Sequence, residues 1–70
     1  MRGVVKEGKG LFGENFVLVN NQGKIIAFIK DYEYKLSQYV NNSIELELEL
    51  EKELPIFLTA NLYRLKKIIK

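Results

Sequence analysis

The strongest constraint on the fold is a strict alternation of apolar and acidic side chains within residues 43–53. A period of two residues predicts a strand with one buried face and one solvated face, whereas a helix would scatter the same leucines around its axis. The acidic side chains stand about 7 Å apart, and no second ligand-bearing element accompanies them, so we expect a solvated face rather than a metal site. The apolar members are Ile44, Leu46, Leu48 and Leu50, and the acidic members are Glu45, Glu47, Glu49 and Glu51.

Residues 16–30 carry a second strand signal, because two runs rich in β-branched and aromatic residues flank a turn sequence at residues 20–23. This arrangement predicts a hairpin. We expect its aliphatic face to be buried and its mixed aromatic and basic face to meet solvent. The inward set is Val17, Val19, Ile25, Ala27 and Ile29, and the outward set is Phe16, Leu18, Lys24, Ile26, Phe28 and Lys30.

A glycine-rich loop, residues 8–13, follows a predicted first strand over residues 2–7. Glycines at this density predict a loop between two strands, and its Lys9 and Phe12 are candidate ligand contacts. The loop also matches the Gly-x-Gly-x-x-Gly pattern of dinucleotide sites. A strand rather than a helix follows it, so no dinucleotide site is expected.

Residues 31–40 show helical periodicity between the hairpin and the alternating strand. Asp31 is a favourable residue for a helix N-terminus, and the polar residues 41–43 end the pattern. We therefore expect a short helix over residues 31–40, in which Tyr32, Leu36, Tyr39 and Val40 recur at helical spacing. Its aromatic side chains either pack against one end of a barrel, which we favour, or stack on a ligand. These aromatic residues are Tyr32, Tyr34 and Tyr39.

The final segment, residues 56–70, fits two structures. A strand through about Leu65 would supply the partner that the preceding strand needs, and we favour it. A helix beginning near Pro55 would instead align Leu58, Leu62, Leu65 and Ile69 in one stripe. The segment ends in a basic tail, residues 66–70, which is either solubilising or contacts phosphate. The basic side chains of this end are Arg64, Lys66, Lys67 and Lys70.

Composition narrows the classes of function. The 70 residues predict a single domain, residues 1–70, with a net charge of +2 and neither cysteine nor histidine. The chain therefore has no thiol nucleophile, lacks the usual general base and the commonest metal ligand, and shows no convincing pair of catalytic carboxylates, so we expect no enzyme, no cofactor and no metal. It has no apolar run of about 20 residues and no secretory signal at its start, so we expect a cytoplasmic protein without a membrane partner.

The predicted order is strand, strand, strand, helix, strand, strand, with the helix between the third and fourth strands. Together with the opening Gly3-Val4-Val5, this order resembles the OB-fold, and most of all its small anticodon-binding and single-strand-binding members. The resemblance implies a mainly β fold, a small five-stranded Greek-key barrel. The alternating strand followed by Leu54-Pro55 also resembles the end of a tubby-like (LURP-one-related) domain, of which this chain would be about half.

The leading hypothesis is a non-catalytic module that binds single-stranded DNA or RNA with weak sequence preference. Bases would stack on exposed aromatic rings, at about 1–3 kcal/mol each, and lysines would contact phosphates. The competing hypothesis is a protein-interaction or assembly subunit, including a homodimer, which uses the apolar part of the same face. The candidate nucleic-acid contacts are Lys9, Phe12, Phe16, Lys24, Phe28, Lys30, Arg64, Lys66 and Lys67.

Overall fold

The alternating stretch forms the longest strand of the protein, β4 (Ser43–Lys52), as predicted. In the computed structural model, which describes residues 1–70, Ile44 and Leu46 are buried and the glutamates lie on the outer face. The burial weakens toward the end of the strand, where Leu50 is exposed. The other strands are β1 (Arg2–Glu7), β2 (Phe16–Val19), β3 (Ile25–Lys30) and β5 (Leu62–Ile68), and two 3-10 helices are η1 (Lys35–Tyr39) and η2 (Ile56–Leu58).

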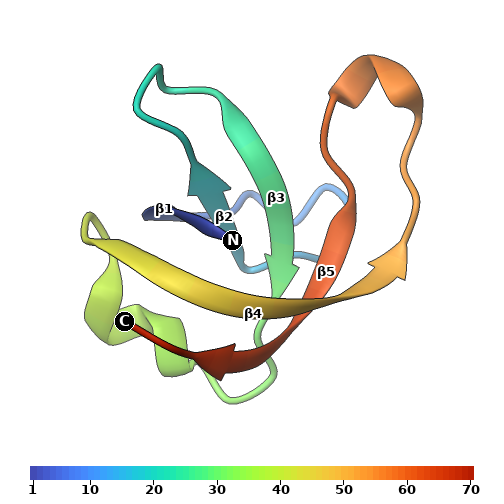
Figure 1. Ribbon diagram of the computed structural model, residues 1–70. Helices are drawn as coiled ribbons and strands as arrows, with labels where there is room; N and C mark the ends of the chain where they lie inside the picture. The colour runs from blue at the N-terminus through green and yellow to red at the C-terminus, as the bar shows by residue number, and fades with distance from the viewer.

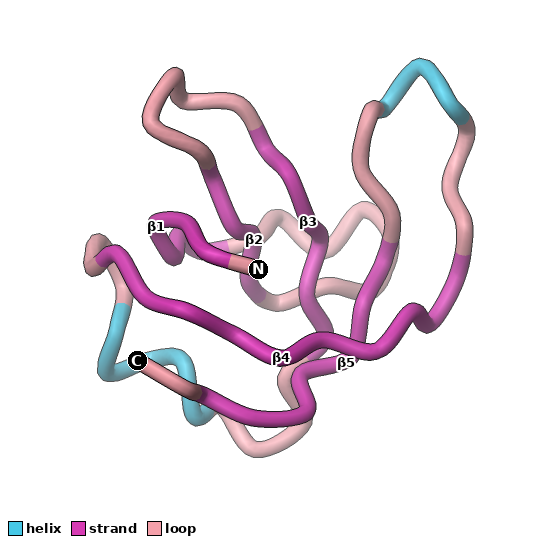
Figure 2. The backbone as a smooth tube through the Cα atoms, in the orientation of Figure 1, coloured by secondary structure: helices cyan, strands magenta, loops and turns pink.

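The five strands close into a barrel in the order β1-β2-β3-β5-β4, with β4 returning to β1 (Figures 1 and 2). All neighbours are antiparallel except β3 and β5, which run parallel over three residue pairs, from Phe28 with Leu62 to Lys30 with Arg64. Closure leaves no open sheet edge. This small five-stranded closed barrel is consistent with the expected OB-like fold. No helix in it has the length and apolar character needed to cross a membrane.

The expected α-helix over residues 31–40 is wrong, because only the short 3-10 helix η1 forms there. Tyr34 precedes it with a φ of 55°, a left-handed conformation that interrupts an α-helix. The Asp31 carboxylate accepts a hydrogen bond from the Leu36 N–H at 2.8 Å, which fixes the turn. Leu36 is fully buried against the barrel interior, so the segment still plugs one end of the barrel.

Strand structure in the last segment begins later than expected. Residues 56–58 form η2, and Thr59 ends it with a φ of 58°, so the strand prediction is wrong there and the helical alternative is wrong beyond Leu58. The Asn61 side-chain oxygen accepts a hydrogen bond from the Leu54 N–H at 3.0 Å, which closes this loop ahead of β5. Lys66 and Lys67, assigned to a terminal tail, lie within β5 beside β4.

The hairpin of β2 and β3 turns a different set of side chains inward than predicted. Phe16 and Leu18 lie in the barrel interior together with Ala27, and Val17 lies on the outer face instead. The register pairs Leu18 with Ala27 and then shifts at a bulge between Leu18 and Val19. The inward and outward positions of β2 and β3 therefore do not stay matched along the whole hairpin. The expected inward positions of Ala27 and Ile29 are confirmed, and those of Val17, Val19 and Ile25 are wrong.

Candidate interaction surface

The aromatic platform expected on the hairpin does not exist, because Phe16 is only 4% exposed and Phe28 only 7%. Phe16 lies among the residues of the barrel interior. Phe28 does lie on the outer face, but the Phe12 ring packs edge-on against it at 5.0 Å between centroids. Leu62 from β5 joins the same outer cluster. A nucleobase therefore cannot stack on either ring without displacing the side chains that cover it.

An apolar cavity of about 290 Å³ lies on this outer face, between the loop after β1 and the strands β2 and β3. Lys9 and Phe12, two of the predicted contacts, both line it. The buried Glu14 carboxylate shapes the loop, because it accepts hydrogen bonds from the N–H groups of Gly10 at 3.1 Å and Phe12 at 2.9 Å. The apolar residues around the cavity are Leu11, Phe12, Val17, Ile25, Phe28 and Leu58.

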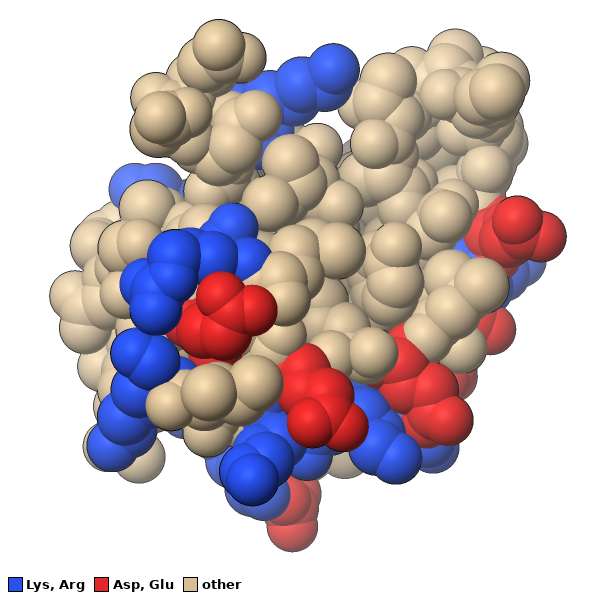
Figure 3. Space-filling model, viewed as in Figure 1, with Lys and Arg blue, Asp and Glu red and all other residues tan.

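The loop between β4 and β5 projects from the barrel beside this cavity, and we call residues 54–60 the apolar loop. Its tip exposes two large apolar side chains, Ile56 at 94% and Phe57 at 79%. In the view of Figure 3 no charged atoms cover its tip, at the upper right, and the charged groups gather below it and at the left. Leu58 lines the cavity, whereas Ile56 lines a separate hollow together with Ile26, so Leu58 is the residue through which the apolar loop meets the cavity.

A third exposed apolar side chain, Leu11, borders the cavity from the other loop and is 75% exposed. Contiguous exposed apolar surface on a small protein marks an interaction site more often than scattered apolar residues do. The docking surface is defined here as the cavity with Leu11, Ile56 and Phe57. The favoured strand prediction placed Phe57 on the outward face but Ile56 on the inward face, so it missed Ile56 as a surface residue, although the uncharged run after Pro55 is a visible signal.

The glutamate row and the basic residues of the last strand lie side by side, because β4 pairs with β5. Arg64 forms an ion pair with Glu49, and Lys67 is paired in register with Glu47. Glu45 accepts a hydrogen bond from the N-terminal ammonium at 2.7 Å, which lowers the pKa of that carboxyl. Phosphate binding by Arg64 or Lys67 would therefore compete with these carboxylates.

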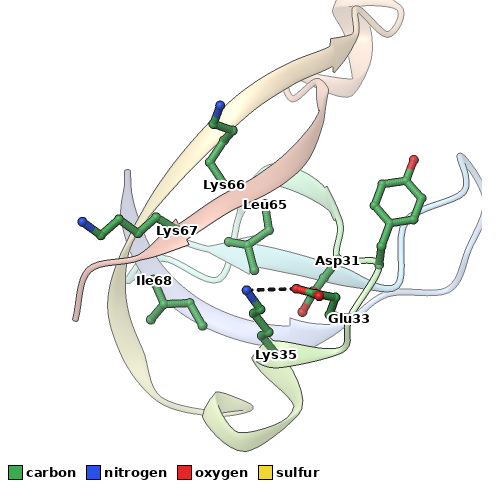
Figure 4. Close-up of a pocket in the computed structure, with 8 residues that line it drawn as sticks. Asp31, Glu33, Lys35, Leu65, Lys66, Lys67 and Ile68 are labelled. Atoms are coloured by element: carbon green, nitrogen blue, oxygen red, sulfur yellow. Dashed lines mark ion pairs between the residues drawn. The ribbon is translucent and has the colours of Figure 1, made fainter.

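A second hollow, of about 580 Å³, lies between β5 and the turn before η1 (Figure 4). Its Lys35 forms a 2.9 Å ion pair with Glu33, and this hydrogen bond raises the pKa of Lys35. Figure 4 shows the Lys66 and Lys67 side chains pointing away from Lys35 in diverging directions. Tyr32, also in the lining, is 64% exposed. The lysines do not converge on one point, and this hollow is a shallow, mixed-charge surface.

The predicted contacts do not form a single site. Lys9 and Phe12 lie at the docking surface, Lys24 is exposed at the start of β3, and Lys30 lies beside Tyr32 with its ammonium 5.6 Å from the ring centroid. No group of three residues that could hold a metal ion occurs in the structure. Comparison with models of protein families, with curated proteins and with solved structures finds no match to this chain.

Proposed function

We propose that this chain is a non-catalytic, OB-like interaction module that docks onto another protein through the docking surface. One observation carries the proposal: Ile56 and Phe57 stand almost fully in solvent at the tip of a short loop. Burying two such side chains in an interface contributes about 3–6 kcal/mol of favourable free energy to binding. A domain of this length has a total free energy of unfolding of only about 4–10 kcal/mol. The free energy available from burying these two side chains is therefore comparable with the stability of the fold.

The backbone of the apolar loop supports a docking role because it is held in one shape. Asn61 bonds back to the Leu54 N–H, and the Thr59 N–H donates to the Ile56 carbonyl at 3.1 Å. A preorganised loop loses little conformational entropy when it binds. The absence of histidine and cysteine supports a binding role over catalysis.

A photo-crosslinking amino acid placed at Phe57 in the cells that produce the protein tests this proposal. Tyr32 is the matched control position, because it is also an exposed aromatic residue but lies outside the docking surface. We expect a protein adduct of discrete mass from position 57 and none from position 32. The adduct should disappear when Ile56→Ser is added. Equal adducts from both positions, or none from position 57, would refute docking at this surface.

A single-stranded nucleic acid is the second candidate ligand, and one observation favours it. The exposed Tyr32 ring lies under the Lys30 ammonium, and Lys66, which forms no ion pair, lines the same hollow. An exposed ring beside lysines suits one stacked base with a phosphate contact. Tyr32 is one of the tyrosines considered for stacking from the sequence, and in this candidate it takes the role that the leading hypothesis gave to Phe28.

Titration of a labelled oligonucleotide at two salt concentrations tests nucleic-acid binding. Loss of one stacked base should weaken the affinity of Tyr32→Ala about 5-fold to 100-fold, whereas Phe57→Ala should bind as the wild type does. Affinity should fall with rising salt, because phosphate contacts release counterions. Absence of binding at low salt, or equal affinity of both variants, would refute this candidate.

A further inference from the structure

We propose that the partner at the docking surface is a second copy of this chain. The two copies are related by a two-fold axis, and each places Phe57 in the apolar cavity of the other. This inference rests on the proposed docking function and names its partner. Three arguments support it: the chain holds both a projecting side chain and a recess, Lys9 and Glu53 are unpaired opposite charges near them, and a stable interface needs only a modest share of the surface of the chain.

The projecting side chain lies next to the recess along the chain, because Phe57 directly precedes Leu58, which lines the cavity. Phe57 is 79% exposed, whereas the neighbouring Leu58 already lines the cavity of its own copy. The cavity of about 290 Å³ equals the volume of roughly ten waters, which accommodates one phenylalanine side chain. In a two-fold interface the same patch serves both partners, so one insertion implies the reciprocal one. Both insertions form together from a single approach of the two copies.

Charges at the edges of the docking surface favour this pairing. Lys9 lies on the loop after β1, at the cavity, which Glu7 also lines, and Glu53 lies just before the apolar loop, lining a separate hollow beside it. Lys9 and Glu53 are exposed, and neither forms an ion pair within the chain. Inserting Phe57 brings the apolar loop of one copy against the loop after β1 of the other. That approach sets Lys9 opposite Glu53 twice, once on each side of the axis.

The area needed is modest for this protein. A stable interface buries about 800 Å² from each partner, which is about a sixth of the 4610 Å² accessible surface of the chain. A chain of 70 residues also has a small core of its own, and dimer formation is a common way for such domains to gain stability.

Equilibrium sedimentation of the wild type and of matched variants tests the proposal. We expect a concentration-dependent dimer whose dissociation constant rises about 30-fold or more in Phe57→Ala. Ile69→Ala, which truncates an exposed apolar residue outside the docking surface, should sediment as the wild type does. Lys9→Glu and Glu53→Lys should each weaken the dimer about 10-fold, because each substitution alters two symmetric contacts. The double variant should restore it to within about 3-fold.

The outcomes separate this inference from the function on which it rests. A monomer at concentrations up to about 1 mM, together with a crosslink from position 57 to a different protein, refutes the second copy and leaves the docking function standing. A dimer unaffected by Phe57→Ala, with no crosslink from position 57, refutes both. A dimer that Phe57→Ala weakens but that the exchanged charges do not restore refutes the two-fold arrangement.

Discussion

Leu36 is the single buried side chain of η1, and its removal measures how much this turn contributes to closing the barrel. Leu36→Ala deletes three carbon atoms at a fully buried position that contacts the barrel interior. Substitutions of this kind cost about 2–5 kcal/mol, from lost transfer free energy and from the cavity that remains. The total stability expected for 70 residues is about 4–10 kcal/mol, so the variant should lose roughly half of it.

Urea unfolding followed by circular dichroism measures the effect, with Leu50→Ala as the matched control. Leu50 is the same residue type but is half-exposed, so its truncation should cost less than about half as much. The midpoint should fall in Leu36→Ala while the slope of the transition stays constant. A loss below about 1 kcal/mol, or an equal loss in both variants, would show that η1 does not seal the barrel end.

Three further predictions concern the loop after β1, the start of β1 and the outer face of β4. Glu14→Ala removes a buried carboxylate that accepts two backbone hydrogen bonds, so it should lower stability by about 1–3 kcal/mol and speed amide exchange at Gly10 and Phe12; unchanged exchange would contradict it. Gly3→Ala places a Cβ 2.8 Å from the Val19 carbonyl oxygen, so it should cost about 1–3 kcal/mol in urea unfolding; a neutral result would refute this close approach. The folded state lowers the pKa of Glu45 below its ordinary 4.5. The ionised Glu45 carboxylate therefore stabilises the folded state above pH 4.5, and this stabilisation is lost as the pH falls through the lowered pKa. Wild type should therefore lose more stability than Glu45→Gln between pH 6 and pH 2, and parallel curves would contradict the interaction.

The strands of this protein could be predicted from the sequence because the alternation of apolar and polar side chains is a local property. The Leu/Glu period of β4 arises from its own pleat, and the prediction needed no knowledge of other elements. The same holds for the two runs that became β2 and β3. The five-stranded barrel was therefore predictable from local patterns together with the resemblance to the OB-fold.

Which face of the hairpin meets solvent could not be predicted from local patterns. Alternation defines two faces, and long-range packing decides what covers each of them. Phe28 is covered by Phe12 from the preceding loop and by Leu62 from the last strand, and neither contact has a local signature. The bulge after Leu18 also changes the alternation midway along the hairpin.

The candidate site was predicted in part. Lys9 and Phe12 were singled out as ligand contacts, and both line the cavity. Ile56 was missed because the favoured strand prediction for this segment placed it on the inward face. Thr59 adopts a left-handed conformation that ends the pattern, and threonine rarely does so, so the uncharged run after Pro55 was the one local signal of an exposed loop.

The parallel ladder of β3 and β5 has a consequence for the order in which the chain folds. Its partners, Phe28 and Leu62, are more than thirty positions apart, whereas β2 and β3 join across a short turn. Closing a longer loop costs more chain entropy before any contact compensates for it. We therefore expect the hairpin to form before the β3–β5 ladder, whose pairing closes the barrel.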